Sequence, residues 1–177
     1  VAFVDFAPLN CLETKEHFSF DSLWLKGGFP DALINKDGAE LNFEWFEFYT
    51  RTLIERDLPS LGIDVDQRQF RLLWKMAAHF HGELLNKNKI ASSLGISPHT
   101  VDRYLGILEQ TFALRLLPPY YQNLKKRLVK SPKLYLRDSG IFHYFRNIKS
   151  FEDLTASPDL GNSFEGMVVE QICQICG

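Results

Sequence analysis

Several features that would assign a function are missing from this sequence. It has no apolar run of about eighteen residues, the length that a membrane-spanning helix needs, and no signal-peptide pattern. Cysteine is scarce, with three in 177 residues. A chain of this composition does not fit a secreted, disulfide-stabilised protein. These absences predict a cytoplasmic protein in a reducing compartment, without a membrane partner.

The cysteines also fall short of a metal site. Cys173 and Cys176 form a single CxxC within a stretch that has helical, half-apolar periodicity. A structural zinc ion needs four ligands, and Cys11 and scattered histidines are all that remain to complete the set. We interpret the two thiols as part of an apolar helix face. No nucleophile, metal set or phosphate loop is complete, so the sequence predicts a chain that is not an enzyme and holds no cofactor.

Charge is distributed unevenly along the chain. The formal net charge is −2 overall. Residues 86–137 contain ten Lys and Arg against two Asp and Glu, which gives +8, whereas residues 1–85 carry −6 and residues 138–177 carry −4. A concentrated basic segment is expected where a protein meets a phosphate backbone. A solvated basic face with no ligand is the alternative.

The basic segment begins with the pattern of a helix-turn-helix over residues 86–110. A short helix is expected over 87–93, and Gly95 can end it in a left-handed conformation. Ser97 is placed to cap the next helix, with Pro98 at its first position. Four apolar residues of that second helix recur at i, i+3, i+4 and i+7 and predict one buried stripe: Val101, Tyr104, Leu105 and Leu108. The alternative is a helical hairpin that only packs in a core and binds nothing.

Two strand-like stretches, 112–117 and 128–136, follow the second helix. A helix-turn-helix followed by a β-hairpin is a winged helix, which places its second helix in the major groove of DNA. The expected contacts combine the exposed start of that helix with cations of the hairpin, which would meet phosphate without reading bases. The predicted DNA-binding residues are Ser97, His99, Thr100, Arg103, Lys125, Lys126, Arg127, Lys130 and Lys133.

The rest of the chain reads as mainly helical. Helices are expected after Asp21, from Pro30, over 41–58, after Asp66 and over 139–145 and 161–177, and a strand over 1–7. His79 and His81 are expected to cap the end of the helix that Asp66 begins. The fold class predicted is mainly α, α+β: a helical linker and a winged helix-turn-helix, followed by the start of a truncated nuclease-like α/β module.

Several runs resemble a known family. They are LWLKGGFPDAL (23–33), YTRTLIERDLPSLGI (49–63), the long run 85–141 and GNSFEGMVVEQI (161–172). The most specific part is KRLVKSPKLYLRDSG (126–140) together with the helix-turn-helix before it. The chain resembles the region that follows the ATPase in bacterial and archaeal AAA-type ATP-binding proteins, called domain of unknown function 4143. The resemblance implies a missing N-terminal ATPase that binds ATP and magnesium, because no GxxxxGK[ST] occurs here. It also implies a module similar to PD-(D/E)xK nucleases that begins at Asp138 and Glu165. The alternative for Asp138 is a helix cap, and the alternative for Glu165 is a surface carboxylate of a helix.

The predicted organisation has four parts: an exit strand of the ATPase (1–14), a helical linker (15–64), the winged helix (65–137) and the start of the C-terminal module (138–177). The function expected is that of a non-catalytic fragment of such an ATPase, whose winged helix binds double-stranded DNA and which partners its own ATPase domain. The alternative is a protein docking module that links the ATPase and C-terminal domains. The sequence predicts no oligomeric state.

Overall fold

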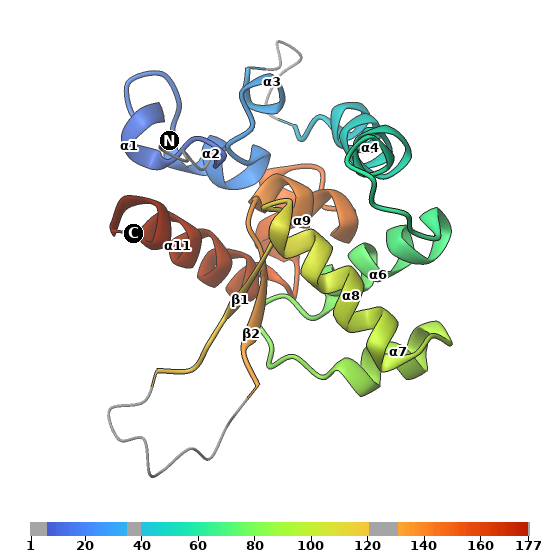
Figure 1. The fold of residues 1–177 in the computed structure, drawn as a ribbon. Helices are drawn as coiled ribbons and strands as arrows, with labels where there is room; N and C mark the ends of the chain where they lie inside the picture. The colour runs from blue at the N-terminus through green and yellow to red at the C-terminus, as the bar shows by residue number, and fades with distance from the viewer. Residues whose placement is uncertain (1–6, 35–39, 121–130, 177) are drawn as a thin grey trace. The chain divides into compact units, whose positions relative to one another are not determined.

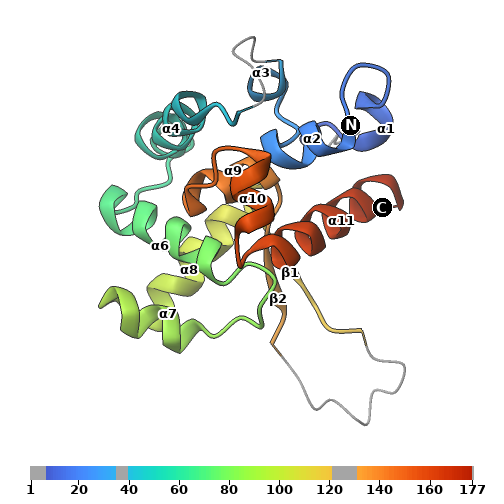
Figure 2. The same ribbon diagram turned by 180° about the vertical axis from the view of Figure 1, so that it is seen from behind.

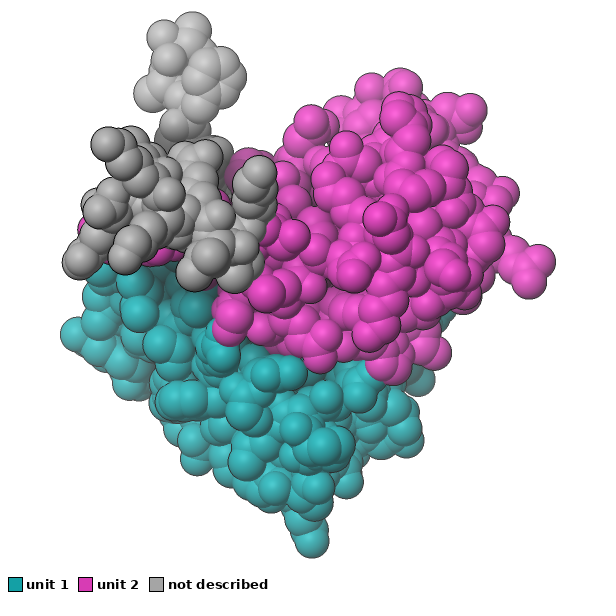
Figure 3. All heavy atoms as spheres, turned by 90° about the horizontal axis from the view of Figure 1, so that it is seen from below, with its two compact units in different colours: residues 1–48, 138–177 teal, residues 49–137 magenta. Residues whose placement is uncertain are grey.

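The computed structural model describes residues 7–34, 40–120 and 131–176 (Figures 1 and 2). These residues are mainly helical, with a two-stranded antiparallel sheet, so the predicted mainly α, α+β class is confirmed at that level. The expected strand over 1–7 lies, except for Ala7, outside the described residues. The chain forms two compact units, residues 1–48 with 138–177 (unit 1) and residues 49–137 (unit 2) (Figure 3).

The elements follow one another in this order: α1 (Cys11–Thr14), α2 (Phe20–Lys26), α3 (Pro30–Leu33), α4 (Phe43–Thr52), the π-helix η1 (Leu53–Asp57), α5 (Leu58–Ser60), α6 (Gln67–His79), α7 (Lys87–Leu94), α8 (Pro98–Gln110), β1 (Leu114–Leu117), β2 (Lys133–Leu136), α9 (Ser139–Arg146), α10 (Phe151–Ala156) and α11 (Leu160–Cys176).

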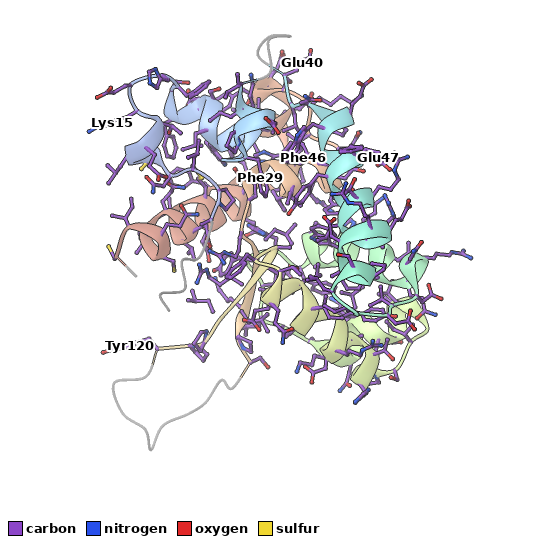
Figure 4. All side chains as sticks on the ribbon, turned by 45° about the horizontal axis from the view of Figure 1, so that its top comes forward. Lys15, Phe29, Glu40, Phe46, Glu47 and Tyr120 are labelled. Carbon is purple, nitrogen blue, oxygen red and sulfur yellow. The ribbon has the colours of Figure 1, made fainter. Side chains whose placement is uncertain are left out.

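Unit 1 is built around α2, which packs against α9 and α10, while α11 packs against α9 and α10. Its core is a cluster of buried apolar side chains: Leu23, Trp24, Leu25, Leu33, Ile148, Leu154 and Met167. Phe46 of α4 is fully buried, whereas the next residue, Glu47, is exposed and accepts a hydrogen bond from the Tyr144 hydroxyl (Figure 4).

Helix α2 is capped by Ser19, whose side chain accepts the Ser22 N–H at 3.1 Å. The predicted cap, Asp21, is wrong, because Asp21 lies inside the first turn, where its charge still suits the helix dipole. Gly27 ends the helix with φ of 78°, a conformation that favours glycine. The next N–H, that of Gly28, donates to Asp138 at 2.8 Å, so the turn after α2 is tied to the start of α9.

Unit 2 contains α6, α7 and α8, which pack on one another, and the hairpin of β1 and β2. Asp66 caps α6 through the Gln69 N–H at 2.8 Å, as predicted. The antiparallel register pairs Leu114 with Leu136 and Leu117 with Lys133. The first strand begins at Leu114 and not at residue 112, and the second is described from Lys133, while residues 128–130 of the predicted second strand lie outside the described residues.

Two further expectations are corrected. The predicted helix over 41–58 begins at Phe43 and changes at Leu53 into a π-helix. The helical path then continues as α5, in which Pro59 lies in the first turn and has no N–H to donate to the preceding turn. His81, expected as a helix cap, is instead 2% exposed and its Nδ1 accepts the Leu136 N–H at 3.0 Å. It therefore joins the end of the α6 region to β2.

Candidate nucleic-acid interface

The two helices and the turn predicted over 86–110 are confirmed. Asn86 caps α7 through the Lys89 N–H at 3.0 Å. Gly95 ends α7 in the left-handed region with φ of 65°. Ser97 caps α8 through the Thr100 N–H at 3.0 Å, with Pro98 at the first helical position. Local signals in the sequence were sufficient for these features because each cap and turn is made within a few residues.

The inner side of α8 is the predicted apolar stripe. Val101, Tyr104, Leu105 and Leu108 are all buried. The ring of Tyr104 meets that of Phe70 on α6 edge-on, with centroids 5.2 Å apart. The outer side at the start of α8 is thereby fixed, and it presents His99, Asp102 and Arg103 as exposed side chains.

Two of the predicted contact residues already bond to each other. The hydroxyls of Ser97 and Thr100 are 2.8 Å apart, and the Ser97 oxygen also accepts the Thr100 N–H. Ser97 therefore has a structural role as a helix cap. Thr100 is half-buried, which leaves His99 and Arg103 as the more accessible members of the set.

Arg103 is held by the segment that precedes α6. Its guanidinium donates to the carbonyl of Asp64 and lies over the ring of Tyr104, 5.9 Å from the centroid. The Tyr104 hydroxyl in turn accepts the Asp66 N–H at 3.2 Å. Arg103 must leave the Asp64 carbonyl before its guanidinium can reach a base edge.

A residue that the sequence prediction missed, Lys87, bonds to the exposed side of α8. Its ammonium forms an ion pair with Asp102, and this contact, more than any other, lowers the pKa of the Asp102 carboxyl. The signal was present in the sequence as a cation at the first position of α7, but the pairing of α7 with α8 was needed to see it. Asp102 itself adds a negative charge to the proposed DNA-facing side.

An open pocket of about 580 Å³ lies where α7 and α8 begin. It is lined by Leu85, Asn86, Lys87, Asn88, Pro98, Ser131 and Pro132. The N-terminal end of a helix carries a partial positive charge and N–H groups without partners in the helix. The pocket therefore combines two such ends with the ammonium of Lys87.

Most of the predicted wing contacts fall in a part of the chain that is not described. Lys125, Lys126, Arg127 and Lys130 lie outside the described residues. Lys133 is half-buried at the start of β2, opposite Leu117. Tyr120, three residues after the end of β1, is 86% exposed (Figure 4). The structure thus brings Lys133, and none of the other wing cations, into the described part of the candidate interface.

Unit 1 contains a buried polar network that the sequence prediction did not anticipate. The Trp24 N–H donates to the Ser163 hydroxyl at 2.8 Å, Ser163 lies 2.7 Å from Nε2 of His143, and Nδ1 of His143 lies 2.8 Å from the Leu25 carbonyl. Because the carbonyl must accept, Nδ1 carries the proton and Nε2 accepts from Ser163. Burial lowers the pKa of His143 to about 4, so the ring is neutral at pH 7.

A serine beside a neutral histidine is the arrangement of an activated nucleophile, but here it is sealed. Ser163 is 1% exposed and His143 is fully buried. The Ser163 oxygen also accepts a hydrogen bond from the Trp24 N–H. We interpret the network as structural, joining α2, α9 and α11.

Asp138 is another buried polar residue of unit 1, at 3% exposure. It caps α9 through the Ile141 N–H at 2.9 Å, which confirms the helix-cap alternative. Burial raises the pKa of its carboxyl to about 6, and the hydrogen bonds that it accepts from backbone N–H groups oppose that rise. Glu165 is half-buried on α11. The described residues hold no cluster of three or more potential metal ligands, nor a helix long and apolar enough to cross a bilayer.

The described residues form a mainly helical fold with a small two-stranded antiparallel hairpin. Residues 17–152 match the model of a domain of unknown function, DUF8612, and the chain belongs to this family. It is 38% identical over 158 residues to the uncharacterized protein Rv2008c of Mycobacterium tuberculosis and to the uncharacterized protein Mb2031c of Mycobacterium bovis. The match covers 88% of this chain and 35% of each relative, so the chain spans about a third of their length. No solved structure matches.

These comparisons correct the family resemblance. The matching family is DUF8612, not domain of unknown function 4143, and neither relative is described as an AAA-type ATP-binding protein. The interpretation of the chain as the C-terminal region of such an ATPase was wrong. The expected ATPase partner, its ATP and magnesium, and the nuclease-like module rested on that resemblance and lose their support. The comparisons also describe no DNA-binding relative, so a DNA interface rests on the chain's own residues.

Proposed function

We propose that unit 2 is a winged helix that binds double-stranded DNA. The observation that carries the proposal is the exposed start of α8, where His99 and Arg103 face solvent beside a pocket formed by the beginnings of two helices. In this arrangement α8 enters the major groove and the hairpin of β1 and β2 follows the backbone.

Phosphate contacts would come from two sources. The starts of α7 and α8 offer a favourable dipole for an anion, although the Lys89 and Thr100 N–H groups already donate to the caps Asn86 and Ser97. The hairpin adds the cations of 125–130 and Lys133. Such contacts fix the register of the protein on the duplex and make binding dependent on salt.

The ion pair between Lys87 and Asp102 sets a specific expectation for this interface. Asp102 repels phosphate and holds the ammonium of Lys87. Asp102→Asn removes the repulsion and releases the lysine, so DNA affinity should rise, by roughly threefold to tenfold. Removing a carboxylate from a surface that does not meet DNA would leave the affinity unchanged.

The test is a fluorescence-anisotropy titration of a mixed-sequence duplex with wild type, Asp102→Asn and the triple variant Lys125→Ala, Lys126→Ala, Arg127→Ala. If about six phosphates are neutralised, log K should fall against log salt with a slope of roughly −5, and the triple variant should flatten that slope. Arg56→Ala is the matched control, because Arg56 is an exposed cation of unit 2 that pairs with Asp57. No binding at low salt, or binding that ignores salt, refutes the proposal.

A protein docking surface is the second candidate, and the local charge pairing favours it. The described cations beside α8 already have acceptors, since Lys87 pairs with Asp102 and Arg103 bonds to the Asp64 carbonyl. A surface with satisfied charges can pack against a protein without losing phosphate contacts. Salt-insensitive or absent DNA binding in the titration would favour this candidate.

A further inference from the structure

The exposed side of α8 forms a regular row of its own. His99, Asp102 and Arg103 are all exposed and stand at positions i, i+3 and i+4 of the helix, opposite its buried stripe. Gly106 continues the row at i+7, and a Cβ placed there would meet nothing within 4 Å. The row is therefore open to a ligand from the start of α8 to Gly106.

Asp102 gives this row its carboxylate, and α7 holds that carboxylate in place. Helix α7 packs beside α8 (Figures 1 and 2), and the Lys87 ammonium donates to Oδ1 of Asp102. Among the described residues Oδ2 accepts no hydrogen bond, and the Asp102 side chain is 62% exposed. Lys87 also lowers the pKa of Asp102, so the carboxyl is ionised at neutral pH. The ion pair thus positions a charged acceptor whose second oxygen can meet a ligand.

A carboxylate discriminates among the four bases in the major groove. It accepts hydrogen bonds and donates none. Guanine presents the acceptors N7 and O6 there, and thymine presents the acceptor O4, so both repel a carboxylate. Adenine presents the donor N6 beside the acceptor N7, whereas cytosine presents the donor N4 without an acceptor of its own. Cytosine is therefore the base that best fits a carboxylate.

We propose that Asp102 determines base specificity in the DNA contact of unit 2 by accepting a hydrogen bond from N4 of a cytosine. The inference rests on the function proposed above, because α8 must lie in the major groove for Asp102 to reach a base. The carboxylate then has two opposite effects. It weakens binding to DNA in general by repelling phosphate, and it favours one base pair over the other three.

Replacing Asp102 with asparagine should change the preferred base. The two side chains have the same shape, but the asparagine amide has a donor as well as an acceptor. Such an amide pairs with both N6 and N7 of adenine. Asp102→Asn should therefore lose the preference for cytosine at one position of the site and prefer adenine there.

The experiment begins with selection of bound duplexes from a randomised library by wild type and by Asp102→Asn. Anisotropy titrations then compare the four base pairs at the position where the selected sequences differ. Wild type should bind the duplex with cytosine there roughly fivefold to a hundredfold more tightly than the other three. Asp102→Asn should bind the duplex with adenine most tightly. Equal thermal midpoints of the two proteins check that the variant is folded.

Glu55→Gln is the matched control. Glu55 is a carboxylate of unit 2 outside α8, its side chain is 51% exposed, and it lies 4.0 Å from Arg71. Glu55→Gln therefore removes the same charge and a comparable ion pair, and it should keep the base preference of wild type. Loss of the cytosine preference in Asp102→Asn but not in Glu55→Gln supports the proposal.

Two different failures can be told apart. If Asp102→Asn binds duplex DNA with the base preference of wild type, or if wild type prefers no cytosine, the assignment of Asp102 is overturned while DNA binding by unit 2 stands. If neither protein binds any duplex, the function proposed for unit 2 is refuted and the assignment of Asp102 with it.

Discussion

Asp138 should make the stability of this protein fall as the pH rises through the acidic range. The carboxyl is buried and its pKa rises from 3.8 to about 6, chiefly because burial disfavours the charged form. The folded protein therefore holds this proton more tightly than the unfolded chain, in which the pKa is about 3.8. The free energy of unfolding loses this contribution between pH 3.8 and about 6, and the loss is complete above that range.

The magnitude follows from the interval between the two pKa values. At about 1.4 kcal/mol for each pH unit, the rise corresponds to about 3 kcal/mol. Asp138→Asn has no titrating group, although it loses one of the acceptors used by Gly28 and Ile141. At a single pH, the difference in free energy of unfolding between Asp138→Asn and wild type combines several effects. The change of that difference with pH reports the titration of Asp138 alone.

The assay is urea unfolding of wild type and Asp138→Asn at pH 4 and pH 7.5. The free energy of unfolding of Asp138→Asn minus that of wild type should increase by about 2.4 kcal/mol from pH 4 to pH 7.5, slightly less than the full interval because at pH 4 the unfolded carboxyl is already more than half ionised. Other carboxylates titrate in both proteins and cancel in the difference. A constant offset across this range would refute the reasoning, because it would show that Asp138 keeps an ordinary pKa in the folded protein.

Two further expectations concern packing. Ser163→Ala removes the hydrogen-bond partner of both the Trp24 N–H and Nε2 of His143. It should lower the free energy of urea unfolding by about 1–3 kcal/mol for each group left without a partner. Ser92→Ala, at an exposed position of α7, should change that free energy little, and equal effects of the two substitutions would contradict a stabilising role for the network. Gly140→Ala should destabilise the protein strongly, because the new Cβ would lie 2.3 Å from the Lys26 carbonyl oxygen. In contrast, a Cβ at Gly106 in α8 would meet nothing within 4 Å. Gly106→Ala should therefore raise the thermal midpoint, because alanine favours the helix by up to about 1 kcal/mol over glycine. A destabilised Gly106→Ala would show that α8 is packed more tightly there.

The features that the sequence predicted correctly are those decided within one turn of chain. Gly95, Ser97 and Pro98 act on their immediate neighbours, and so do the caps Asp66 and Asp138. The α2 cap shows the limit of such reasoning, because Ser19 and Asp21 both suit the start of a helix and lie two residues apart. The helix α10, with its cap Ser150 and Asp153 in a capping box, carried a local signal that was overlooked.

The features that the sequence did not reveal depend on distant residues. His143 meets Ser163 twenty residues later and the Leu25 carbonyl 118 residues earlier. No periodicity or spacing in the sequence indicates such a meeting, because it follows from the packing of α2, α9 and α11. His81 is similar, since the Leu136 N–H that it accepts lies 55 residues away. Buried polar contacts between elements therefore mark the boundary of what this sequence predicts.

The net charge of the basic segment overstates the cations that are free to meet phosphate in its described part. Lys87 pairs with Asp102, Arg103 bonds to a carbonyl, Lys89 lies 5.1 Å from the centre of the Phe80 ring and Arg137 lies 5.3 Å from that of Phe112. Each of these contacts must be released or shared before the cation can neutralise a phosphate. If unit 2 binds DNA, Arg103→Ala should therefore change the salt dependence by less than the slope of about 0.9 expected for the loss of one full phosphate contact. A change of that full size would show that the pairing seen here does not limit binding.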